Sequence, residues 1–126
     1  MEMHVAPIRL DDKFARFSDH WSPKVIAELK GQAVKVAKVS GEFVWHDHAT
    51  EDELFLVHRG VLYIDFEDRP TVTLTAGDLY VVPRGVRHRP RTDAGEEAWI
   101  VLVEPLTTRH TGDVEHPLTR HDTPRI

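Results

Sequence analysis

Short apolar runs, each bounded by turn-forming residues, recur along most of the chain. Those in the main body occupy residues 43–48, 53–58, 61–66, 71–75, 78–83, 88–92 and 98–105. Glycine, proline and aspartate between them favour tight turns. Because no long amphipathic helix separates these runs, they predict an all-β fold, an antiparallel sandwich or barrel rather than a parallel sheet with crossover helices.

The N-terminal part of the chain predicts a short helix followed by a hairpin. Residues 11–17 begin with two aspartates, which suit a first helical turn, and carry Phe14 and Phe17 on one side. Residues 25–29 and 33–40 are expected to be two strands joined by a tight turn. We expect a single domain divided into an arm with the short helix (1–24), a β-barrel (25–106) and a polar tail that lies over the surface or crosses to a partner (107–126).

Some of the predicted strands are apolar on both faces. In the run that starts at Glu53, Phe55 and Val57 share the face of Glu53, whereas Leu54 and Leu56 occupy the other. The second face must be covered, either by the N-terminal hairpin of the same chain or by a second copy of the protein. We favour a homodimer, because exposed sheet edges and apolar faces are commonly covered by a partner subunit.

Composition narrows the function. The 126 residues carry a formal net charge of -5, which disfavours a nucleic-acid binder that must neutralise phosphates. The chain contains no cysteine, so disulfides, thiolate metal sites and thiol nucleophiles are excluded. We find no signal peptide and no membrane span, and therefore expect a cytoplasmic protein.

Four residues have the types and spacing of a metal site. His46 and His48 stand two positions apart, so in an extended strand their imidazoles share one face with Val44, opposite Phe43 and its neighbours Trp45 and Asp47. Glu53 reaches the same space if the next run forms a hairpin with the first. His88 follows a second turn-rich stretch and is the natural fourth ligand. Neutral imidazoles and a carboxylate predict one divalent transition metal per chain, either Fe, Mn, Ni, Co or Zn.

The same residues resemble the two sequence motifs of the cupin superfamily. The first motif is matched by Gly41, His46, His48, Glu53 and Gly60, and the second by Gly77, Pro83, Gly85 and His88. The chain is most similar to small single-domain bacterial cupins of the mannose-6-phosphate isomerase-like group. This resemblance implies a double-stranded β-helix, a jelly-roll-like antiparallel barrel, around the four ligands. Two positions depart from the motifs: Gly41 stands one residue closer to the histidines, and Thr92 replaces an asparagine.

Strand alternation also predicts the wall of a substrate pocket. The expected wall is apolar and suits a small organic ligand held mainly by the metal; its residues are Val44, Phe55, Val57, Leu62, Ile64 and Phe66. Tyr63 and Asp65 fall on the opposite face, so no inward acid or base is found beyond the ligands. That favours dioxygenase-like metal chemistry. A sugar isomerase or epimerase, which needs a base, and a non-catalytic metal-binding or ligand-binding barrel stay open as alternatives.

Other basic residues are assigned to outer surfaces. Arg84, Arg87, Arg89 and Arg91 surround His88 and could recognise an anion. Alternation, however, directs three of them away from the face of His88, so a solvated outer face is preferred. His58 falls on the face opposite Glu53. The remaining histidines lack metal-like spacing and are expected at the surface.

Overall fold

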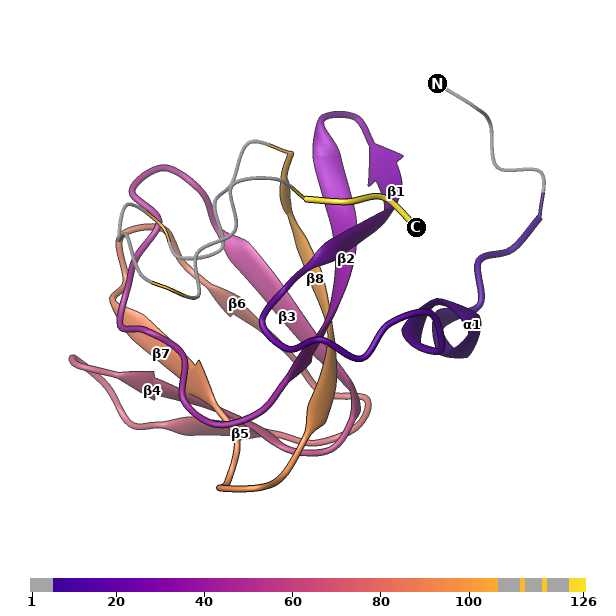
Figure 1. Cartoon of the computed structure of the whole chain (residues 1–126). Coiled ribbons are helices and arrows are strands. Elements are labelled where there is room, and N and C mark those ends of the chain that lie inside the picture. The colour runs from indigo at the N-terminus through magenta and orange to yellow at the C-terminus, as the bar shows by residue number, and fades with distance from the viewer. Residues whose placement is uncertain (1–5, 107–111, 113–116, 118–122) are drawn as a thin grey trace.

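The computed structural model describes residues 6–106, 112, 117 and 123–126, which fold mainly into two antiparallel sheets (Figure 1). The larger sheet has the order β1-β2-β8-β3-β6, formed by Lys24–Leu29, Gln32–Val39, Ala98–Pro105, Glu53–Arg59 and Leu79–Val82. The smaller has the order β5-β4-β7, formed by Val72–Leu74, Leu62–Phe66 and His88–Arg91. The predicted all-β antiparallel fold is confirmed.

The inner faces of the two sheets share one hydrophobic core. Alternate residues of β3 and β4, such as Phe55 and Val57 or Leu62 and Ile64, are buried there together with Ile100 of β8. This pattern follows from the two-residue period of a strand, which turns every second side chain inward.

The outer face of the larger sheet is partly covered by the short helix α1 (Leu10–Phe14) and the chain around it. Phe14 is fully buried, and its ring stacks on those of Trp99 and His58, with centroid distances of 4.9 and 5.4 Å. The expected cover, the hairpin β1–β2, instead forms part of the larger sheet itself. Coverage by the chain's own N-terminal segment therefore accounts for part of the apolar second face, while the homodimer stays a prediction.

The strand expected over residues 43–48 is wrong. Within this segment only His46 forms a bridge, to His88, and the preceding residue Glu42 forms another, to Arg91. Because the segment lacks a continuous ladder, regular alternation is not imposed on it, and Phe43 is buried beside His46 rather than on the opposite face. The two rings meet edge-on, with their centroids 5.5 Å apart.

Two terminal segments pack against the larger sheet. The helix α1 ends at Phe14, three residues before the expected end. No helix in the described part of the chain is long and apolar enough to span a membrane. At the other end, the Val25 amide donates to the carbonyl of Pro124 at 2.9 Å, and the Ile126 amide donates to that of Val25 at 3.1 Å. The rest of the predicted tail falls mostly outside the described residues.

Candidate metal centre

The four predicted ligands come from both sheets and from the segment that joins β2 to β3. Glu53 is the first residue of β3 and His88 the first residue of β7, whereas His46 and His48 precede β3. Backbone hydrogen bonds hold the two sides together: the amides of His46 and His88 each donate to the other's carbonyl, at 3.0 and 2.9 Å. The amide of Gly85 donates to the carbonyl of His48 at 2.8 Å.

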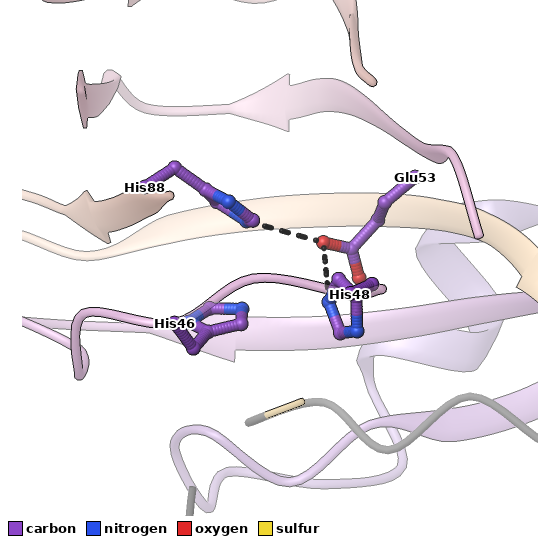
Figure 2. Close-up of side chains that lie close together, drawn as sticks. All are labelled: His46, His48, Glu53 and His88. Carbon is purple, nitrogen blue, oxygen red and sulfur yellow. Dashed lines mark ion pairs between the residues drawn. The ribbon is translucent and has the colours of Figure 1, made fainter. Parts of the chain in front are cut away.

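The side chains of these four residues converge on one point (Figure 2). One ligand atom from each lies within 4.8 Å of all the others, and all four residues are buried. Oε1 of Glu53 lies 3.4 Å from Nε2 of His48 and 3.6 Å from Nε2 of His88. The fold therefore brings together the four residues predicted from their types and spacing.

Hydrogen bonds on the far side of two rings orient their free nitrogens inward. Nδ1 of His46 lies 2.9 Å from the carbonyl oxygen of Val44, and Nδ1 of His88 lies 2.9 Å from that of Val86. A carbonyl only accepts, so each Nδ1 donates and leaves the lone pair on Nε2. Metal-bound histidines typically donate their other ring nitrogen in this way, which fixes the orientation of the ring.

The inward atoms have no hydrogen-bond partner among the described residues. They are Nε2 of each histidine and Oε1 of Glu53, all fully buried. Unpaired buried polar atoms are costly and rare in native folds, so a cluster of them calls for an explanation. A divalent transition metal fits, because three imidazole nitrogens and one carboxylate oxygen are its usual donors.

The pKa shifts of His46 and Glu53 suit such an ion, whereas that of His48 opposes its binding. Burial and the neighbouring His88 lower the pKa of His46 to about 3, so its ring is neutral at ordinary pH. Burial alone would raise the pKa of Glu53, but its polar contacts with Glu104, His48 and His88 outweigh burial and hold that pKa well below its usual range. Burial likewise opposes charge on His48, yet the nearby carboxylate of Glu53 leaves the His48 pKa raised. Metal binding would release that proton.

Two buried ionisable residues next to the cluster were not among the predicted site residues. Glu104 of β8 is 0% exposed, and its Oε1 lies 3.0 Å from Nζ of the buried Lys35 on β2. Burial and the charge of Glu53 raise the pKa of Glu104 well above its usual range. The available signal was alternation: Glu104 is an acid on the same strand face as the apolar residues Ile100 and Leu102.

A small, mainly apolar cavity of about 30 Å³, set in about 340 Å³ of empty space that includes open solvent, adjoins the cluster. Its lining includes two of the four predicted ligands, His46 and Glu53. The full lining is Trp21, Pro23, Ala37, Val39, Phe43, His46, Glu53, Phe55, Pro90, Ile100 and Leu102. Strands β2, β3 and β8 thus supply much of the wall, rather than β3 and β4 as expected.

Of the six predicted wall residues, only Phe55 lines this cavity. Val57, Leu62, Ile64 and Phe66 are buried in the core, and Val44 packs against it. Alternation placed four of these side chains inside correctly, but inside the barrel they meet other side chains rather than this space.

The arginines near His88 have acidic partners on the outer face. Nε of Arg91 and Nη2 of Arg89 lie 2.7 and 2.9 Å from Oδ2 of Asp65, and Thr71 donates to Oδ1 at 2.8 Å. Burial would raise the pKa of Asp65, but these hydrogen bonds lower it to about 2. Arg87 pairs with Glu67 at 3.3 Å. These contacts support the preferred outer-face interpretation over an anion site at the metal.

The two positions that depart from the cupin motifs contact each other. The amide of Gly41 donates to Oγ1 of Thr92 at 2.8 Å, and the amide of Thr92 donates to the carbonyl of Gly41 at 3.0 Å. This pair joins the start of the histidine-bearing segment to the end of β7. The departures therefore leave the two motifs connected.

Comparison with known proteins agrees with this architecture. The family model described as "Cupin domain" matches residues 33–104, which include all four predicted ligands. Among curated proteins, YdbB of Bacillus subtilis (strain 168) is 41% identical over 81 residues, which cover 64% of this chain and 66% of that protein.

Solved structures show the same likeness. A cupin-2 domain containing protein from Shewanella frigidimarina is 51% identical, with a TM-score of 0.73 over 78% of this chain and 93% of the other. A candidate mannose-6-phosphate isomerase from Ralstonia eutropha JMP134 is 27% identical, with a TM-score of 0.55 over 66% of this chain and 82% of the other. The predicted resemblance is confirmed, and the chain belongs to the cupin family.

Proposed function

We propose that the protein binds one divalent transition metal through His46, His48, Glu53 and His88. The observation that carries this proposal is the cluster of four buried ligand atoms that lack hydrogen-bond partners among the described residues. Iron, manganese, nickel, cobalt and zinc all accept this donor set. When bound, such an ion would supply Lewis acidity and open coordination positions for a substrate.

We further propose that the substrate is a small, largely apolar organic molecule and that the chemistry is dioxygenase-like. The cavity beside the ligands supports this choice, because Glu53 and His46 are the only ionisable side chains among the described residues that line it. The apolar body of a substrate would pack against residues such as Phe43, Phe55 and Leu102. Its polar group would face the histidine and the carboxylate.

A sugar isomerase is the second candidate, because the Ralstonia eutropha neighbour is named as a candidate mannose-6-phosphate isomerase. A phosphorylated sugar would call for a cationic side chain and for a base. The described lining of the cavity contains neither a lysine nor an arginine. A non-catalytic metal-binding or ligand-binding barrel is the third candidate, and measured turnover distinguishes it from both enzymes.

A homodimer is also proposed. The edge strand β6 exposes Leu79 and Val81, which are 56% and 45% exposed, beside the half-buried Leu54 and Leu56 of β3. An apolar edge of this kind favours association with a second copy. Light scattering is expected to report twice the chain mass, and a monomer at micromolar concentration would contradict the dimer.

Elemental analysis tests the metal centre directly. The protein would be purified without added metal, beside a His46→Ala, His48→Ala double variant and a His20→Ala control that removes an exposed histidine paired with Glu97. We expect near-stoichiometric metal in the wild type and control, and its loss in the double variant. No metal in any of them, and none taken up on titration, would leave a structural barrel.

Oxygen consumption by the metal-loaded protein then tests the reaction class. A panel of small aromatic and aliphatic acids, alcohols and ketones would be compared with sugar phosphates, each in an oxygen electrode and by product analysis. Oxygen uptake with an apolar substrate is expected. Interconversion of a sugar phosphate without oxygen uptake would favour the isomerase, and no turnover by the loaded protein would favour the binding module.

A further inference from the structure

We propose that Glu104 is a positioning residue of the metal centre, held by Lys35 and orienting the carboxylate of Glu53 toward the three histidines. The inference rests on the proposed metal-binding function, which it deepens. It concerns a residue that touches Glu53 rather than the site where the substrate would bind.

Strand pairing places the two carboxyl groups side by side. On β3 and β8, Leu54 pairs with Val103 and Phe55 with Leu102, and the same antiparallel register continued by one residue sets Glu53 opposite Glu104. Directly opposite residues on one face have neighbouring side chains. On the other side of Glu104 the partner is the small Ala33 of β2, which leaves room for a longer side chain nearby.

Lys35 uses that room. It lies two residues beyond Ala33 on the same face of β2, and its Nζ reaches Oε1 of Glu104 at 3.0 Å. The side chains of Lys35 and Glu104 are 3% and 0% exposed. Burying such a pair carries a large desolvation cost, and apolar residues of similar size would often stabilise a strand as well or better. The pair therefore calls for a reason beyond strand stability.

The second oxygen of Glu104 supplies that reason. Oε2 is buried and has no hydrogen-bond donor among the described residues, and the register of β3 and β8 sets the Glu104 carboxyl group beside that of Glu53. The two carboxyl groups are therefore neighbours on one face of the sheet. This contact restrains Glu53 while its Oε1 faces His48 and His88.

Glu104 acts through Glu53 rather than as a ligand. It is not one of the four residues whose ligand atoms cluster within 4.8 Å, and it does not line the cavity. Residues in this supporting position orient the ligands and tune metal affinity, and their loss typically costs roughly 10- to 100-fold in binding.

Two substitutions of similar length separate positioning from packing. Glu104→Met removes every hydrogen bond, whereas Glu104→Gln keeps an acceptor for Lys35 and a donor for Glu53. Metal-free protein would be titrated with Co²⁺, and both the Kd and the visible absorption spectrum recorded. We expect Glu104→Met to weaken binding by about tenfold or more and to shift the spectrum, with Glu104→Gln within about threefold and its spectrum unchanged.

The outcomes are distinguishable. A wild type that takes up no Co²⁺ overturns the metal centre and this inference with it. A wild type that binds, with a Glu104→Met variant of unchanged Kd and spectrum, overturns the role of Glu104 alone, as do Met and Gln variants that behave alike. Should the Glu104→Met variant fail to fold, Lys35→Met tests the same role of Glu104. It removes the contact that holds Glu104 in place, so the Co²⁺ spectrum should again shift. An unshifted spectrum in that variant overturns the proposal.

Discussion

Strand β7 presents two polar faces with opposite properties. His88 points inward, where its Nε2 is buried and has no hydrogen-bond partner among the described residues. Arg89 and Arg91, the next and third-next residues, point outward and share the carboxylate of Asp65. Buried polar atoms without protein partners are retained where a ligand supplies the missing partner. Ion pairs whose partners are all present instead stabilise the fold. The inner face is therefore assigned to function and the outer face to structure.

The largest effect expected from this contrast is on metal binding by His88→Ala. Removing one of four ligands should weaken metal binding beyond the roughly 10- to 100-fold loss caused by supporting residues. The metal-free protein should keep its stability within about 1 kcal/mol, because the substitution also removes a buried ring nitrogen that has no hydrogen-bond partner among the described residues, which offsets the packing that is lost. Calorimetric titration and thermal unfolding measure the two effects. Metal affinity equal to that of the wild type would show that the inner face of β7 does not bind the metal.

The outer face should show the reverse response in Asp65→Asn. This change leaves Arg89 and Arg91 without their shared carboxylate, and we expect a loss of about 2 to 3 kcal/mol in the free energy of unfolding at neutral pH. Metal affinity should stay within about twofold of the wild-type value, since Asp65 contacts none of the ligands. Urea denaturation and metal titration of the same variant give both numbers. A large fall in affinity would show that the two faces are coupled.

Lowering the pH should remove the contribution of Asp65 on the outer face to the free energy of unfolding. Folding lowers the pKa of Asp65 from an ordinary 3.8 to about 2, so between these values the folded state binds fewer protons than the unfolded chain. The resulting stabilisation, about 2 kcal/mol, is complete above about pH 4 and is lost as the pH falls through about 2. The stability difference between wild type and Asp65→Asn should therefore shrink on acidification. Urea titrations at successive pH values would reveal a constant difference if the Asp65 pKa were ordinary.

The smallest expected effect comes from a histidine outside the cluster that is paired through Nε2. His58 faces outward on β3, stacks on Phe14 and lies 2.7 Å from Asp11 through Nε2. His58→Ala should cost about 1 kcal/mol in unfolding free energy and leave metal binding unchanged. Thermal unfolding and metal content check both points. Comparing this variant with His88→Ala distinguishes the loss of a metal ligand from the loss of a histidine outside the metal centre.

Local pattern was sufficient for most of the strands and for the ligand set. The inward burial of Phe55, Leu62 and Ile64 follows from alternation alone, because successive side chains of any strand point to opposite faces. The ligand set came from spacing together with the cupin resemblance, and the fold clusters those four side chains.

Pattern failed where regular pairing stops. Phe43 was placed opposite His46 by an alternation that its segment does not obey, since only single bridges hold that segment. The cavity wall was likewise drawn from β3 and β4, whereas β2 and β8 supply several of its residues. Which inward side chains border the cavity depends on how the two sheets pack. The alternation within a single strand does not predict that packing.

The amino-acid sequence by itself determined the all-β class, the inward faces of the regular strands and the identity of four candidate ligands. Tertiary structure alone decided that Glu104 stands beside Glu53 and that Lys35 reaches it. The physical reason is register: Lys35 and Glu104 are 69 residues apart, and the pairing of β2 with β8 brings their side chains together, while the pairing of β8 with β3 sets Glu104 beside Glu53.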